Sequence, residues 1–289
     1  MSDASEDRRL EIAAVLDEAL VCRDELSKAT VPGPGSAAEH DLANLTAELT
    51  RAVNRQIALV DLWMVVSTDQ VHGLAVLIRE GTTVFSLFPL IRSILEHSTA
   101  VIWVLGGEPN GRPVKASLLA LRGQEELAKA ASRLGGKGSP THREAKQRLN
   151  DLREEVRQEF GSLELEPLTI NEQRLLSPTE LVAHYGKLWG DERQWTGAYD
   201  YLCGTATHPA LNAREYFDSE APMGSGPAIS ADLLNRLLRI GLVPFLKALE
   251  YVSSYLGLPA EPRELYVDRL NAVFGDVLVW PEPQDETEE

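Results

Sequence analysis

The sequence has few of the features that mark secreted, disulfide-bonded or membrane-spanning proteins. It contains 2 cysteines in 289 residues, too few for a disulfide framework or a four-thiolate zinc site, so we expect a reducing, cytoplasmic compartment. The first twenty residues carry acidic groups where a signal peptide would carry basic and apolar ones, and no export is expected. The longest apolar stretch, from Val84 to Leu105, contains Arg92 and Glu96. Such charges cost roughly 2.5 to 3.5 kcal/mol each at the centre of a membrane span, so a buried helix is the better interpretation.

Basic charge is also scarce. The chain has 28 Lys and Arg against 44 Asp and Glu, a net charge of −16, which opposes non-specific binding to nucleic acids and anionic membranes. We therefore expect neither duplex DNA nor a membrane as a partner. Residues 111–160 differ from the rest of the chain, because their 11 Lys and Arg outnumber their 7 Asp and Glu. Acidic and basic residues alternate there and no stacking aromatics lie among them, which favours a solvated helix pair over a surface for an anionic partner.

The familiar catalytic motifs are absent as well. The sequence has no G-x-S-x-G elbow, phosphate-binding loop, G-x-G-x-x-G turn or H-E-x-x-H helix. None of the histidines is paired with another histidine or an acid at a metal-binding spacing; they are His40, His72, His97, His142, His184 and His208. We expect no metal and no cofactor, and the motifs leave open whether the protein is an enzyme.

The dominant hydrophobic period is 3.6 residues, and the alternation typical of strands is missing. This predicts an all-α, single-domain bundle of nine to eleven helices over residues 1–280, with an acidic disordered tail at 281–289. The helix at about 82–105 is hydrophobic on nearly every face and should lie at the centre. The other predicted helices cover residues 6–29, 37–67, 70–79, 113–134, 140–160, 179–189, 193–207, 231–256 and 262–278.

Two boundaries have particular sequence signals. Ser177, Pro178 and Glu180 occupy the N-cap, N1 and N3 positions of a capping box, the clearest helix start in the chain. Residues 161–176, just before it, show no convincing period and are predicted to be a connector.

One charged pair stands out in the apolar central helix. Arg92 and Glu96 are four residues apart, so their side chains meet on one helical face and should form an ion pair, mostly buried. Such a pair can fix the helix register, or it can hold a guanidinium and a carboxylate in a cleft to receive a ligand.

A second polar constellation lies in the segment DYLCGTATHPAL. The spacing of Tyr201, Thr205 and His208 places them on one helical face, and the following proline ends the helix. His208 can cap the last carbonyls, or it can share a pocket with the charged pair. We interpret Arg92, Glu96, Tyr201 and His208 as a polar site for an unidentified small-molecule or protein partner.

The same residues carry a family resemblance. The run FSLFPLIRSILEHSTAVIWVL, followed about a hundred residues later by YLCGTATHP, resembles a prokaryotic, mostly helical family catalogued as a domain of unknown function. The resemblance spans roughly residues 59–211 and matches Arg92, Glu96, Tyr201 and His208. It implies an α-helical bundle and no particular activity.

A more distant resemblance is to the HEPN ribonucleases of prokaryotic defence and toxin systems, whose motif is an arginine followed four to six residues later by a histidine. Arg92 and His97 fit that spacing. The resemblance implies metal-independent RNA cleavage across a homodimer interface. However, five residues along a continuous helix rotate His97 by roughly 140° from Arg92, and Ser93 departs from the usual motif. The preferred interpretation is therefore a ligand-binding or interaction protein, and a HEPN-like ribonuclease is the alternative.

Overall fold

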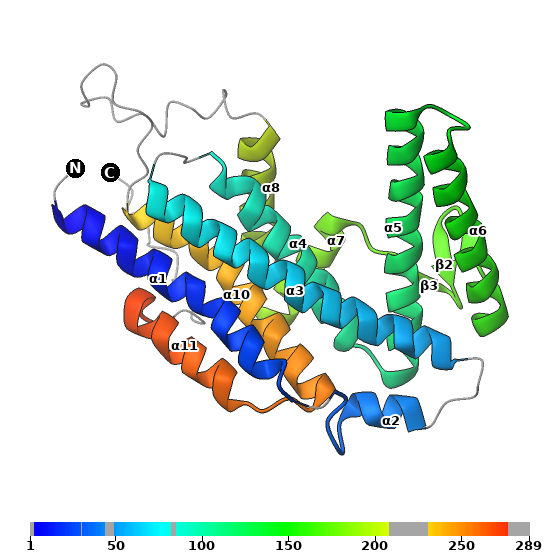
Figure 1. Cartoon of the computed structure of the whole chain (residues 1–289), viewed down its shortest axis with the longest axis horizontal. Helices are drawn as coiled ribbons and strands as arrows, with labels where there is room; N and C mark the ends of the chain where they lie inside the picture. The colour runs from blue at the N-terminus through cyan, green and yellow to red at the C-terminus, as the bar shows by residue number, and fades with distance from the viewer. Residues whose placement is uncertain (1–2, 30, 44–48, 82–84, 208–230, 277–289) are drawn as a thin grey trace.

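The computed structural model describes residues 3–29, 31–43, 49–81, 85–207 and 231–276. Over these residues the fold is all-α, as predicted, with ten α-helices, one short 3-10 helix and a small sheet (Figure 1). The helices are α1 (Asp3–Leu26), α2 (Ala37–Ala43), α3 (Thr50–Glu80), α4 (Leu87–Leu105), η1 (Pro109–Gly111), α5 (Arg112–Gly135), α6 (Pro140–Phe160), α7 (Pro178–Trp189), α8 (Glu192–Thr207), α10 (Ala231–Leu256) and α11 (Glu261–Phe274). The predicted acidic tail lies outside the described residues.

The central hydrophobic helix is α4. It packs against α3, α10, α7 and α8, and its Ile91, Ile94 and Leu95 are fully buried. By length and composition α4 is also the one described helix that could cross a membrane. Its apolar side chains are covered by the neighbouring helices, as in the core of a helical bundle.

The N-terminal half of the bundle is built around α3, which packs against α1 and α4 (Figure 1). A break near residues 68–69 was predicted, and this is wrong because α3 continues from Thr50 to Glu80. Thr68 Oγ1 donates a hydrogen bond to the Met64 carbonyl at 2.7 Å, so this polar residue is accommodated inside the helix. The helix ends at Gly81, which has a left-handed φ of 67°.

Helices α5 and α6 form an antiparallel hairpin that stands beside the rest of the bundle (Figure 1). Ser139 caps α6 by accepting a hydrogen bond from the His142 amide, and the predicted capping box at Ser177 and Glu180 is present at the start of α7. Both helix starts are therefore confirmed. The bases of α5 and α6, at Arg112 and Phe160, lie next to the N-terminal end of α3.

The connector before α7 contains strands that the sequence did not reveal. β1 (Glu164–Leu165), β2 (Leu168–Ile170) and β3 (Gln173–Arg174) form an antiparallel sheet in the order β1-β2-β3. Glu164 pairs with Thr169, which in turn pairs with Arg174. Strands of two or three residues are too short to show a period of two, which explains the error.

Candidate functional site

The predicted charged pair forms part of a three-residue cluster between α4 and α8. Arg92 Nε donates to Glu96 Oε1 at 2.7 Å, and the Tyr199 hydroxyl donates to the same oxygen at 2.6 Å. The Arg92 guanidinium also lies 5.7 Å from the centroid of the Tyr199 ring, within the range of a cation–π contact. Arg92 and Glu96 retain 32% and 26% of their side-chain exposure, so the pair is partly buried.

The electrostatics of this cluster keep its donors protonated. The hydrogen bond to Glu96 raises the pKa of Arg92, and burial followed by the Glu96 hydrogen bond raises the pKa of Tyr199. Cys203, one helical turn after Tyr199, also hydrogen-bonds that tyrosine. Both donors bond to the same carboxylate oxygen, so the cluster joins α4 to α8 through Glu96 Oε1.

The structure places the other predicted residues differently. Tyr201 bonds to neither Arg92 nor Glu96; its ring lies edge-on to Phe88 at 6.0 Å. Two residues along a helix correspond to a rotation of roughly 200°, which is why Tyr199, and not Tyr201, reaches the pair. His208 lies outside the described residues, so its place in a shared pocket stays a prediction.

The residues of the ribonuclease motif both lie on α4. This helix is continuous from Leu87 to Leu105, and His97 is exposed while Arg92 is bonded to Glu96. Partial desolvation, opposed by Glu96, lowers the pKa of His97. Among the described residues, no group of three or more His, Cys, Asp or Glu side chains could hold a metal ion.

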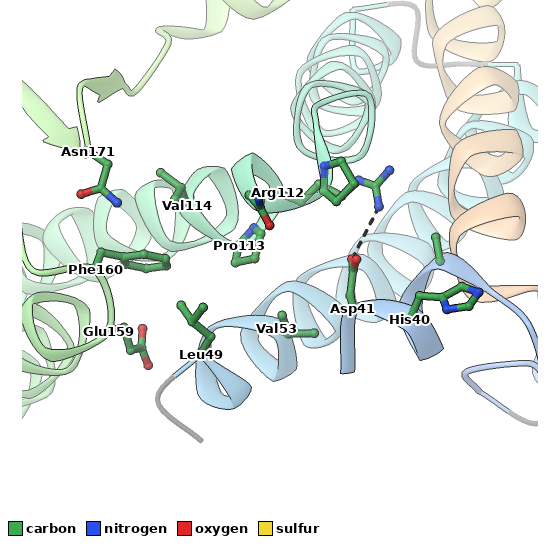
Figure 2. Close-up of a pocket in the computed structure, with 13 residues that line it drawn as sticks. His40, Asp41, Leu49, Val53, Arg112, Pro113, Val114, Glu159, Phe160 and Asn171 are labelled. Carbon is green, nitrogen blue, oxygen red and sulfur yellow. Dashed lines mark ion pairs between the residues drawn. The ribbon is translucent and has the colours of Figure 1, made fainter. Parts of the chain in front are cut away.

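A larger candidate site lies at the base of the α5–α6 hairpin, where a cavity of about 650 Å³ opens against α2 and α3. We call it the hairpin cavity. Figure 2 shows Asp41 and Arg112 at one end and Glu159 and Asn171 at the other. Apolar side chains line the walls between these two ends, among them Leu49, Val53, Pro113, Val114 and Phe160 (Figure 2).

Asp41 and Arg112 form an ion pair at the first end, with Oδ2 and Nη1 3.5 Å apart and side chains only 11% and 17% exposed. Arg112 is fixed from two further sides. Its Nε donates to the Leu105 carbonyl at 3.2 Å, and its guanidinium lies 5.6 Å from the centroid of the Tyr255 ring. The cation is therefore held in place by α4 and α10, on which these two partners lie.

A buried charge network forms the second end. The Glu159 side chain is fully buried, and Arg55 Nη1 donates to its Oε2 at 3.0 Å and to Ser117 Oγ at 2.8 Å. Arg55 Nη2 also contacts Glu155, and Arg51 lies 3.7 Å from Glu159. Because a buried carboxylate needs a partner, this network fixes the base of α6 to α3.

The sequence interpretation missed the hairpin cavity. Asp41 and Arg112 are 71 positions apart and belong to no short motif, so only the folded chain brings them together. The basic excess of residues 111–160 identified the hairpin as a distinct segment but indicated nothing about its base. The sequence offers one local signal near Arg112. Pro109 and Pro113 flank this residue and mark the starts of helices η1 and α5.

Comparison of the chain with protein-family models, with curated proteins and with solved structures finds no match in any of the three. Functional inference for this protein therefore depends on its own geometry.

Proposed function

We propose that this protein binds a small molecule in the hairpin cavity. The observation that carries the proposal is a cavity of about 650 Å³ with the largely buried ion pair of Asp41 and Arg112 in its wall. Small-molecule sites in proteins typically have volumes of roughly 300 to 1,000 Å³ and combine apolar walls with a few fixed polar groups.

The fixed position of the polar groups supports this function. Arg112 is held by a backbone carbonyl and by an aromatic ring, and Glu159 is held by Arg55. Groups that are already ordered lose little conformational entropy when a ligand arrives, which favours binding. The walls come from α2, α3, α5 and α6, so a ligand would contact both the bundle and the hairpin.

This proposal keeps the class of function that the sequence suggested and assigns it a different location. The Arg92, Glu96, Tyr201 and His208 site stays a separate prediction. Glu96 is already bonded by Arg92 and Tyr199, whereas Asp41 and Arg112 lie 3.5 Å apart in the wall of the hairpin cavity, farther than in a normal hydrogen bond.

The test uses N-phenyl-1-naphthylamine, an uncharged dye whose fluorescence rises in apolar surroundings. We expect a saturable increase with one site per chain. The variant Val114→Trp places an indole in the cavity wall and should weaken dye binding at least tenfold. Val65→Trp is the matched control, because Val65 is exposed on α3, and it should bind the dye like the wild type.

Two checks make the result decisive. Far-ultraviolet circular dichroism shows whether each variant keeps its helical content, and Leu49→Trp, at a half-buried position of the cavity wall, fills the cavity if Val114→Trp fails to fold. The proposal is wrong if the wild type binds no dye, or if both filled variants fold and bind the dye as tightly as Val65→Trp.

A further inference from the structure

The charged groups around the hairpin cavity neutralise one another. Asp41 is paired with Arg112 at one end, and Glu159 is paired with Arg55 at the other. The remaining titratable residue in the wall, His40, is exposed. An ionised ligand would bring an uncompensated charge into a partly desolvated space, which is unfavourable. The charge balance therefore favours an uncharged ligand.

The ion pair of Asp41 and Arg112 has unused hydrogen-bonding capacity. Its separation of 3.5 Å exceeds the 2.7 to 3.2 Å of a normal N–H···O hydrogen bond. Asp41 Oδ2 has no accessible surface and lies near the Tyr255 hydroxyl, so a ligand reaches only the 11% of the Asp41 side chain that is exposed. A ligand group that accepts from the guanidinium and donates to the carboxylate would satisfy both without replacing either charge.

Two further buried polar side chains lie next to this pair. The side chains of Gln56 and Tyr255 are buried, and the Tyr255 hydroxyl lies within reach of both the Asp41 carboxylate and the Gln56 amide. Burial and then the nearby Asp41 carboxylate raise the pKa of Tyr255, so its hydroxyl stays protonated beside Asp41. These buried neighbours hold the Asp41 carboxylate in place, so it is already ordered when a ligand arrives.

We infer that the ligand of the hairpin cavity is an uncharged molecule with an apolar body and a head that carries a hydrogen-bond acceptor next to a donor, as in a carboxamide. This inference rests on the proposed function. The carbonyl of the head accepts from Arg112, and its N–H donates to the exposed part of the Asp41 carboxylate. The body lies along the apolar side chains Val53, Val114 and Phe160, which face the space between the two polar ends (Figure 2).

The test compares three probes with the same apolar body and different heads: naphthalene-2-carboxamide, naphthalene-2-carboxylate and 2-naphthylmethylammonium. Isothermal titration calorimetry at pH 7 on the full chain should show the carboxamide binding at least tenfold more tightly than either ion. The inference is overturned if the carboxylate or the ammonium probe binds as tightly as the carboxamide, or if the carboxamide does not bind.

Two single substitutions, each of which removes one charge of the pair, should abolish the preference for the carboxamide probe. Asp41→Asn leaves Arg112 without its carboxylate, so the carboxylate probe should become the tightest ligand. Arg112→Gln leaves Asp41 unpaired, so the ammonium probe should become the tightest. The matched controls are Asp61→Asn and Arg122→Gln, at exposed positions on α3 and α5, and they should keep the wild-type order.

The outcomes separate this inference from the proposed function. If the naphthylamine dye binds and is blocked by Val114→Trp but the carboxamide shows no preference, the cavity binds small molecules and the assignment of ligand class is wrong. If neither the dye nor any of the three probes binds, both are wrong. If one charge variant does not fold, the other still tests the reversal of preference.

Discussion

The hydroxyl of Tyr199 donates a hydrogen bond of 2.6 Å to the carboxylate of Glu96, although 103 positions separate the two residues in the chain. The bond connects α8 to the central helix α4. It shares its acceptor oxygen with Arg92, which lies on the same helix as Glu96.

Replacing Tyr199 with Phe should lower the free energy of unfolding by about 1 to 2 kcal/mol, because one hydrogen bond to a partly exposed charged group is lost. Urea denaturation followed by circular dichroism measures this change. Tyr251→Phe is the control, since the Tyr251 hydroxyl has no hydrogen bond within the described residues, and it should change stability by less than about 0.5 kcal/mol. Equal effects in the two variants would show that the Tyr199 bond contributes nothing.

Glu155 and Glu159 give a matched pair, because both contact Arg55 but differ in burial. Glu159 has no side-chain exposure and Glu155 has 42%. Glu159→Ala should lower the free energy of unfolding by about 3 kcal/mol, since Arg55 loses its buried partner. Glu155→Ala should cost less than about 1 kcal/mol, as is usual for an exposed pair. Chemical denaturation of the two variants checks the ranking, and a larger loss for Glu155→Ala would contradict it.

The capping box at the start of α7 should make stability depend on pH. The hydrogen bond from Arg174, and then those from Ser177, lower the pKa of Glu180 to about 2. An unfolded glutamate titrates near a pKa of about 4.3, so the ionised carboxylate stabilises the fold above that pH. This contribution is lost as the pH falls through about 2.

Carbon-detected NMR titration of the Glu180 carboxyl measures its pKa directly. In addition, the difference in urea midpoint between the wild type and Glu180→Gln should shrink as the pH is lowered from 6 to 2. Arg174→Met should bring the pKa only part of the way back toward its ordinary value, because the Ser177 amide still donates at 2.8 Å. A Glu180 pKa near 4.3 in the wild type would rule out the effect.

The ribonuclease alternative predicts that the protein cleaves RNA, whereas a binding protein should leave RNA intact. Arg92 is bonded to Glu96, and α4 is unbroken between Arg92 and His97, so the two should not converge on one phosphate. We expect single-stranded and structured RNA to stay intact during incubation with the protein and a chelator. Cleavage that is lost in His97→Ala and retained in His208→Ala would establish the ribonuclease. Cleavage lost only in His208→Ala would indicate a different chemistry.

The features that the sequence predicted well are those that depend on neighbouring residues. The capping box at Ser177 needs four consecutive positions, and the pair of Arg92 and Glu96 needs one helical turn. The apolar run of α4 likewise predicted its central place. In each case the physical cause acts within a few residues, so a pattern in the sequence is sufficient.

The features that were missed depend on contacts between distant segments. Tyr199 and Tyr201 have similar local surroundings in the sequence, and only the packing of α8 on α4 decides which of them meets Glu96. The hairpin cavity needs α2, α3, α5 and α6 to come together. Hydrophobic periodicity does not predict a cavity, because a cavity forms where side chains from different helices do not meet.

The hairpin cavity lies at one end of the long α5–α6 hairpin. Arg112, Val114 and Glu159 lie at the fixed end of the hairpin and form a wall of the cavity, while its free end is roughly 35 Å away along a helix of 24 residues. A small rotation that widens or narrows the cavity is therefore magnified at the tip. Two fluorophores, one on the tip and one on α1, would report any rotation of the hairpin as a change in distance far from the cavity.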